Sequence, residues 1–257
     1  MIPMQKLLLP LSILIAGGLI AGTILFVNTK TPATNTLPTN TVKKEVRTVQ
    51  NNDHILGSPK AKLVIIEYSD TECPYCKVFH ETLQKVIAEY GNSSKVAWVY
   101  RHFPIPQLHP KAAKEAEALE CAAAQGGNDM FWKYTDAIYA KTTSNNSLDI
   151  GVYNDPETAP SDASGKPYYT QKTPRSTTDA GILSDTAVTL GLDKAAFEDC
   201  LAKGAFAERV ALDAAEAAAA GGQGTPHSII LVDGQQIPVE GAYPFETLKG
   251  LIDSILK

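Results

Sequence analysis

A Cys-Pro-Tyr-Cys tetrapeptide, Cys73 to Cys76, stands at the junction of a predicted strand and a predicted helix. The strand is expected over 62–68, a short run rich in β-branched residues, and the helix over 74–90, where apolar residues recur at helical spacing. A second buried strand is expected over 95–101. A strand, a helix and a strand of these lengths predict a βαβ unit with two parallel strands.

The rest of the chain predicts helices first and strands again at the end. Helical patterns cover about 109–141 and recur within about 179–220. Two short apolar runs joined by the turn Asp233-Gly234 predict a β-hairpin, and a last helix is expected over 244–256. The order βαβ, helices, ββα predicts an α/β fold in which one sheet is interrupted by a helical insertion over about 106–220.

Glycine and polar residues interrupt this helical region. The first helical pattern breaks at Gly126 and Gly127, and residues 142–178 are rich in Ser, Thr, Asn, Asp and Pro. The second stretch is expected to form a long irregular excursion from the fold.

The N-terminal part predicts a membrane anchor and a tether. Residues 7–27 carry no charge, and 21 residues of helix reach roughly 30 Å, the thickness of the hydrocarbon core. We expect the tail and a single-pass transmembrane helix over 1–27, with a cleaved signal peptide as the alternative. Residues 28–50, rich in Thr, Asn and Pro, predict a flexible linker, which leaves 51–257 as the folded domain.

Composition excludes several classes of protein. The net charge of −5 argues against a partner such as nucleic acid, which requires a basic face. Four cysteines are too few for a small disulfide-rich scaffold, and a chain of 257 residues does not need one.

The position of the cysteine pair gives it a chemical meaning. The backbone N–H groups at a helix start are unpaired and carry partial positive charge, so they stabilise a thiolate on Cys73. Pro74 suits the first helical position because no N–H is required there. Two intervening residues allow the sulfur atoms of Cys73 and Cys76 to close a small disulfide ring. The tetrapeptide therefore predicts a redox-active dithiol.

Two further features lie where they could serve this dithiol. Glu67 interrupts the first apolar strand and could be a buried carboxyl group that relays protons, or a solvated residue at a strand edge. Thr225-Pro226 precedes a predicted strand. A cis bond there would turn the backbone toward the cysteines, whereas a trans proline would simply begin an edge strand.

These motifs together resemble the DsbA-like thioredoxin family. The resemblance covers about 51–257 and rests on the run from Glu67 to Cys76, on Arg101-His-Phe-Pro104, on His109-Pro110 before an Ala-rich helix with Cys121, and on Gly224-Thr-Pro226. It implies a thioredoxin fold with an inserted helical domain. Glutaredoxins share the Pro-Tyr dipeptide, but 149 residues separate Cys76 from Pro226 and leave room for inserted helices.

The resemblance also implies roles for particular residues. Cys73 matches the attacking cysteine, Cys76 its partner, Glu67 the buried acid and Pro226 the cis-proline. The residues expected to bind substrate are Thr225, Pro226, Pro74 and Tyr75. In an oxidising compartment, Cys121 and Cys200 would form a structural disulfide, with two separately buried thiols as the alternative.

The function expected from these features is a membrane-anchored thiol–disulfide oxidoreductase. It would oxidise cysteine pairs of exported proteins on the extracytoplasmic side of the membrane, without a cofactor, and the resemblance implies a quinone-linked membrane partner for its reoxidation. A reductase or isomerase of the same fold is the first alternative. A copper or zinc carrier that uses Cys73, Cys76 and His80 is the second. We expect His227 to be exposed, and His54, His102 and His109 to be loop and cap residues.

Overall fold

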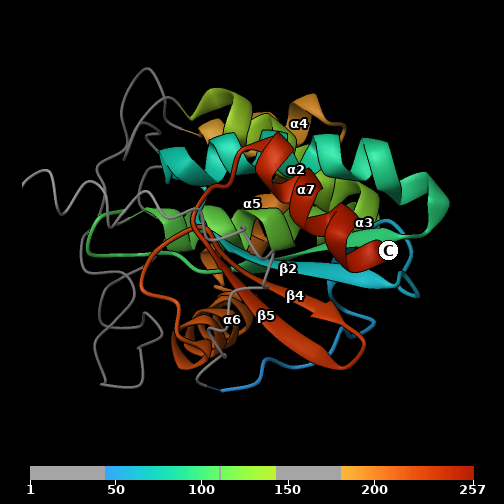
Figure 1. The fold of residues 1–257 in the computed structure, drawn as a ribbon. Helices are drawn as coiled ribbons and strands as arrows, with labels where there is room; N and C mark the ends of the chain where they lie inside the picture. Colours follow the sequence, from blue (N-terminus) through green and yellow to red (C-terminus); the bar gives the residue numbers. More distant parts are fainter. Residues whose placement is uncertain (1–43, 110, 143–180) are drawn as a thin grey trace, which may run out of the picture. The chain divides into compact units, whose positions relative to one another are not determined.

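The computed structural model describes residues 44–109, 111–142 and 181–257, and in these ranges five strands form one sheet (Figure 1). The strand order is β1-β3-β2-β4-β5. Strands β2 and β3 are parallel, and the other pairs are antiparallel. The strands are β1 His54–Leu56, β2 Leu63–Ser69, β3 Val96–His102, β4 His227–Val232 and β5 Gln235–Glu240. The predicted α/β fold, with a βαβ unit and a closing hairpin, is confirmed.

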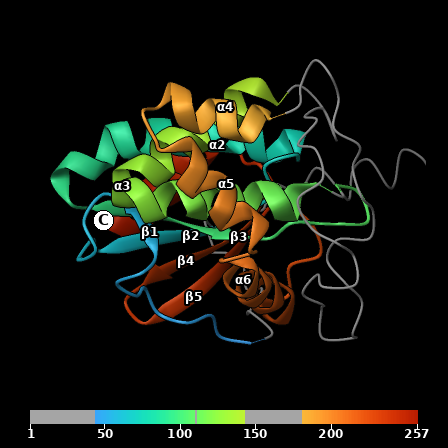
Figure 2. The ribbon, with the colours of Figure 1, turned by 180° about the vertical axis from the view of Figure 1, so that it is seen from behind.

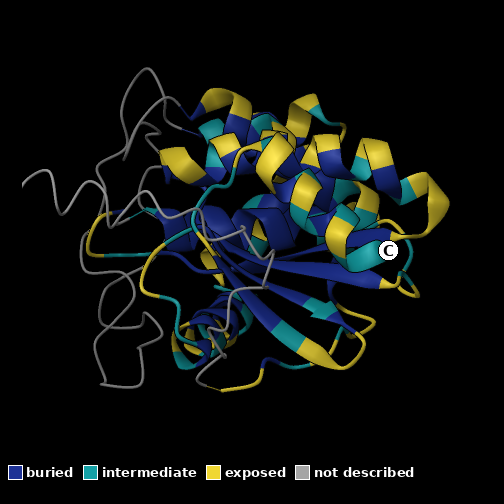
Figure 3. Ribbon diagram, in the orientation of Figure 1, coloured by how far each residue is buried: buried dark blue, intermediate teal, exposed yellow. Residues whose placement is uncertain are grey.

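The central strands β2 and β3 are buried along their whole length, which explains why their sequences are largely apolar on both faces. Helix α2, Pro74–Tyr90, and the 3-10 turn η1, Gly91–Ser93, connect these strands. Strand β2 lies in the middle of the sheet, and the chain passes from its carboxyl end to the start of α2. The start of α2 therefore follows directly after a fully buried strand. Figure 3 shows the central strands in dark blue, whereas the closing hairpin also has teal and yellow segments.

Helices cover both faces of the sheet (Figures 1 and 2). Helices α2 and α7, Phe245–Leu256, lie on one face of the sheet. The larger of the two hydrophobic core clusters forms on this face. Helix α6, Ala207–Ala220, lies on the other face and packs its alanines against residues such as Val64 and Ile229. Small alanine side chains allow this helix to approach the sheet closely.

The chain between β3 and β4 contains α3 Ala112–Lys141, α4 Ile182–Thr189, α5 Lys194–Ala202 and α6. Helix α3 has the predicted interruption, because Gly127 adopts φ 67°, a backbone conformation that favours glycine. Helices α3, α4 and α5 pack on one another, whereas α6 packs directly on β2 and β3. Helix α6 is thus a layer of the sheet domain, although it falls within the range expected for the insertion.

The segment before β1 packs on the folded domain. Val46 is buried, and Arg47 pairs with Asp213 and Glu216 of α6. The flexible linker expected over 28–50 therefore differs from the structure in its last residues, which have buried and ionic contacts. The three-residue strand β1 follows, and the sequence pattern does not predict it.

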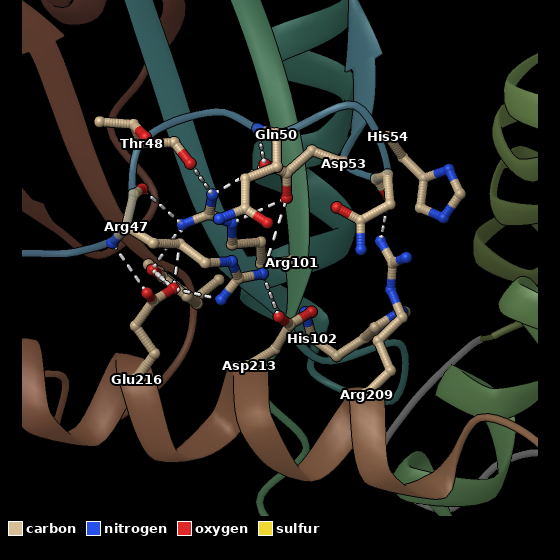
Figure 4. A network of polar contacts seen from close by, with 12 residues as sticks. Arg47, Thr48, Gln50, Asp53, His54, Arg101, His102, Arg209, Asp213 and Glu216 are labelled. Atoms are coloured by element: carbon tan, nitrogen blue, oxygen red, sulfur yellow. Dashed lines mark hydrogen bonds and ion pairs between the residues drawn. The ribbon is translucent and has the colours of Figure 1, made fainter.

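A buried polar network holds this segment in place (Figure 4). The guanidinium of Arg101, fully buried on β3, donates to both carboxylate oxygens of Asp53 at 3.0 and 2.8 Å and to Glu216 at 2.9 Å. It also donates to the hydroxyl of Tyr68. A buried arginine requires such partners, because an uncompensated charge away from water is strongly unfavourable.

Two predicted regions lie outside the described residues. They are the anchor over 7–27 and nearly all of the excursion over 142–178. None of the helices in the described ranges is long and apolar enough to span a membrane.

Candidate active site

The two cysteines lie at the start of α2, where β2 ends. Cys73 is the N-cap residue and Pro74 occupies the first helical position, as the missing N–H of proline allows. Both cysteines are buried and reduced, with 5% of Cys73 and none of Cys76 exposed. Pro74 and Tyr75 between them are exposed. Cys73 is thus the more exposed of the two cysteines.

The two thiols have opposite electrostatic environments. A hydrogen bond from the Cys76 thiol lowers the pKa of Cys73 to about 6, although partial burial opposes this shift, and backbone N–H groups at the helix start also lower it. Complete burial raises the pKa of the Cys76 thiol well above its ordinary value, and the neighbouring Cys73, Glu67 and Asp70 raise it further. At neutral pH the pair therefore holds one thiolate, on Cys73, beside one thiol.

The loop before β4 faces Cys73. The Thr225–Pro226 peptide bond is cis, and the Cys73 thiol donates to the Thr225 carbonyl oxygen at 3.4 Å. Thr225 is half-buried and Pro226 is buried. The structure thus brings together Cys73, Cys76, Thr225 and Pro226, with Pro74 and Tyr75 at the rim of the same site.

Glu67 lies on β2 beneath the dithiol and is completely buried, so the solvated alternative does not hold. The Ser69 hydroxyl donates to one carboxyl oxygen at 2.8 Å, and the Trp98 indole N–H donates to the other at 2.9 Å. Burial raises the pKa of Glu67 to about 8, although these two donors oppose the shift. The carboxyl group can consequently gain or lose a proton near neutral pH.

Two hydroxyl groups extend the site in a way that the sequence analysis missed. Tyr139 of α3 places its hydroxyl oxygen 2.9 Å from that of Ser69 and 3.4 Å from the carbonyl oxygen of Asp70. Ser69 falls two residues after Glu67, so strand alternation places both on one face and could have indicated this contact. Helical spacing predicts that Tyr139, in the inserted helical region, faces inward, but no signal in the sequence indicates its contact with Ser69.

Cys121 of α3 and Cys200 of α5 form a disulfide in the structure. Cys121 is buried within the main core cluster, and Cys200 packs against it. Neither residue starts a helix or has a second cysteine nearby in sequence, so this disulfide lacks the features that distinguish Cys73.

His80 does not complete a metal site with the cysteines. Its Nε2 lies 2.7 Å from Asp136 Oδ1, and its ring packs between Trp98 and Tyr139. In the described ranges no cluster of three or more potential metal ligands occurs. His80 therefore serves as an aromatic core residue with one carboxylate partner.

The structure corrects the predictions made for His227, His54 and His102, whereas His109 lies in the predicted loop before α3. His227 is completely buried, and its Nδ1 lies 3.0 Å from Glu240 Oε2, so the expectation of exposure is wrong. His54 lies in β1 and His102 ends β3, and both contact the Glu120 carboxylate. His109 is buried against Asp70. These positions are explained by carboxylate partners that lie far away in the sequence.

A five-stranded sheet, a dithiol at the start of α2 and a cis proline beside it define a thioredoxin-fold protein with a dithiol centre. The thioredoxin family model matches residues 49–254. The chain therefore belongs to the thioredoxin family.

Solved structures show which members of the family it resembles. DsbA2 of Pseudomonas aeruginosa has a TM-score of 0.58 and 27% sequence identity, over 80% of this chain and 96% of that one. Oxidised BdbD of Bacillus subtilis has a TM-score of 0.59 at 19% identity, over 79% and 92% of the two chains. At the lower identity the likeness concerns the fold alone. The DsbA-like resemblance is thus confirmed at the level of the structure.

A different type of relative matches part of the chain. The Na(+)/H(+) antiporter NhaA 1 of Mycolicibacterium gilvum is 39% identical over 87 residues, which are 34% of this chain. The match spans only 13% of the antiporter's length.

Proposed function

We propose that this protein is a thiol–disulfide oxidoreductase that oxidises cysteine pairs of exported proteins through a Cys73–Cys76 disulfide. The observation that carries the proposal is the asymmetry of the dithiol. Cys73, the more exposed cysteine, has a pKa lowered to about 6, whereas burial raises the pKa of Cys76. A stabilised Cys73 thiolate stabilises the reduced protein, and this makes its disulfide the stronger oxidant.

The proposed reaction consists of two thiol–disulfide exchanges. A substrate thiolate attacks Cys73 Sγ of the oxidised protein, forms a mixed disulfide and breaks the Cys73–Cys76 bond, so Cys76 leaves with the electron pair. A second substrate thiolate then attacks the substrate sulfur and releases Cys73 as a thiolate. The substrate loses two electrons and gains a disulfide, and the cysteine pair gains those electrons. Sulfur carries the whole redox change.

Glu67 supplies a proton in the first exchange. The departing Cys76 thiolate is buried, and its charge is unfavourable there. Burial is the largest cause of the raised pKa of Glu67, and it acts in both redox states, so Glu67 enters the exchange as a carboxylic acid and gives its proton to Cys76 as that thiolate forms. Glu67 is then a carboxylate that Ser69 and Trp98 stabilise by hydrogen bonds, and at neutral pH it regains a proton, because its pKa in the reduced protein is about 8.

The surface around Cys73 suits an extended substrate. Thr225 offers a main-chain carbonyl 3.4 Å from the reactive sulfur, and exposed Tyr75 lies beside it in the tetrapeptide. Main-chain pairing with this loop would bind many sequences, because it does not depend on substrate side chains.

The cellular setting belongs to the same proposal. Residues 7–27 would anchor the protein as a single span, with the catalytic domain outside the cytoplasm. A membrane partner linked to quinones would reoxidise the dithiol. The uncharged run and the similarity to DsbA2 support this placement.

The activity can be tested with the oxidised full chain and a reduced peptide that contains two cysteines. We expect one peptide disulfide per protein molecule, no oxidation by Cys73→Ser, and unchanged oxidation by the double variant Cys121→Ala/Cys200→Ala. Oxidation that survives Cys73→Ser but fails in the double variant would assign the reaction to Cys121 and Cys200 and would contradict the proposal. Stoichiometric copper or zinc binding in place of a disulfide would favour the metal carrier.

A further inference from the structure

The carboxyl group of Glu67 must be hydrogen-bonded in two different charge states during the proposed exchange. It is completely buried, so water cannot compensate for an unpaired proton. Trp98 can only donate, because an indole nitrogen has no acceptor site, and it therefore suits the carboxylate. The acid form needs an acceptor for its own O–H, and of its two hydrogen-bond partners among the described residues only Ser69, on the other oxygen, can provide one.

Ser69 can accept this proton only if its own hydroxyl hydrogen finds another partner. The Tyr139 hydroxyl oxygen, 2.9 Å away, is that partner. Tyr139 in turn can donate to the carbonyl oxygen of Asp70 at 3.4 Å. The hydrogen bonds of this chain can therefore point in either direction, since hydroxyl groups rotate freely to suit their neighbours.

The two directions correspond to the two states of Glu67. With the carboxylate, Tyr139 donates to Ser69 and Ser69 donates to Glu67. With the carboxylic acid, Glu67 donates to Ser69, Ser69 donates to Tyr139, and Tyr139 donates to Asp70. Every polar hydrogen has an acceptor in both arrangements. Without the Tyr139 hydroxyl, the acid form leaves one buried hydrogen unpaired, whereas the carboxylate form leaves none.

We propose that Tyr139 is a positioning residue of the exchange reaction, which acts through Ser69 to let Glu67 be held as a buried carboxylic acid. The inserted helical region thereby contributes directly to proton handling at the dithiol. This inference rests on the proposed function, in which the acid form of Glu67 supplies the proton to Cys76.

The titratable groups that interact with Glu67 come from the start of α2 and from two other elements. They are Cys73, the N-cap of α2, Cys76 of α2, Tyr100 of β3 and Tyr139 of α3. Among them Tyr100 is the natural control. It is buried, and its hydroxyl lies 3.4 Å from that of Tyr139. Removal of the Tyr100 hydroxyl leaves the path from Glu67 to Asp70 intact.

The test is infrared titration of the carboxylic acid band of Glu67 in the reduced full chain, identified by subtraction of the spectrum of Glu67→Gln in each background. In Tyr139→Phe we expect the pKa of Glu67 to fall by about one unit, because one buried donor loses its partner in the acid form. Tyr100→Phe should change it by less than about half a unit. If Tyr139 had a merely structural role, the pKa of Glu67 would rise in Tyr139→Phe, since loss of a polar group disfavours the carboxylate.

An unchanged or raised pKa in Tyr139→Phe would overturn the inference. Should that variant fail to fold, fluorinated tyrosine at position 139 keeps the ring and the hydroxyl. Its hydroxyl accepts less strongly and donates more strongly, so the pKa should again fall, and no change would again overturn the inference. The titration does not involve disulfide exchange. A protein without oxidase activity but with the expected titration would therefore refute the proposed function alone.

Discussion

The sulfur of Cys73 lies 3.4 Å from the main-chain carbonyl oxygen of Thr225, 152 residues further along the chain, and donates to it in the thiol form. The helix start and the loop before β4 thus meet at the reactive sulfur. Cys76 lies deeper, with its sulfur 3.5 Å from the backbone nitrogen of Asp70. This arrangement gives Cys73 the role of contact with substrate and leaves Cys76 as its buried partner.

The acidity of Cys73 should depend on the hydrogen bond from Cys76. Titration of the reduced protein, followed by the ultraviolet absorbance of the thiolate, should give a pKa of about 6. Cys76→Ala should raise this pKa by more than about one unit, because the donor is lost. Cys76→Ser keeps a donor and should raise it less. Equal values in both variants would show that the helix start alone stabilises the thiolate.

Burial of Glu67 should make the stability of the reduced protein depend on pH. The folded state raises the pKa of Glu67 from 4.5 to about 8, so its contribution to stability is fully present below pH 4.5 and declines as pH rises toward 8. Urea unfolding measures the free energy of unfolding of Glu67→Gln and of the wild type. The difference between them should shift in favour of the variant by on the order of 4 kcal/mol as the pH rises from 4.5 to about 8. A difference that does not change with pH would contradict the raised pKa.

The disulfide between Cys121 and Cys200 should stabilise the inserted helices. It joins α3 to α5 across a separation of 79 residues. Loop closure of this length predicts a loss of about 4–5 kcal/mol when both cysteines are replaced by alanine. Denaturant unfolding measures this loss, and the Cys73–Cys76 pair should still form its disulfide. A loss below about 1 kcal/mol would show that packing alone holds the two helices together.

The buried pair of Arg101 and Asp53 should be essential to the segment before β1. Asp53→Asn removes one charge beside a fully buried guanidinium, and we expect a loss of about 3 kcal/mol. The exposed pair of Asp199 and Lys203 provides the control, because Asp199→Asn should cost less than about 0.5 kcal/mol. Equal losses in the two variants would contradict the importance of burial.

The sequence predicts well those elements whose apolar patterns are local. Strands β2 and β3 begin with runs of β-branched and other apolar residues, and Pro74 marks the start of α2. Strand β1 is different, because its three residues are held by pairing with β3 rather than by a pattern of their own. Tertiary contacts decide such short strands, and a single sequence does not contain them.

The same distinction applies to the site. Cys73 and Cys76 are recognisable because their spacing and position at a helix start are local features. Tyr139 is not, because its role depends on the distance between its hydroxyl and Ser69 on another element. His227 illustrates the opposite error: a histidine alone suggests exposure, whereas Glu240 on the neighbouring strand pairs with it.

The proposed function depends above all on the direction of electron flow. The most direct measurement is the reduction potential of the Cys73–Cys76 pair in the full chain, equilibrated with glutathione buffers. Mass spectrometry of alkylated cysteines separates this pair from Cys121 and Cys200. The stabilised thiolate predicts a potential above roughly −150 mV, as a disulfide donor requires. A potential near roughly −270 mV would contradict the claim and identify a reductase.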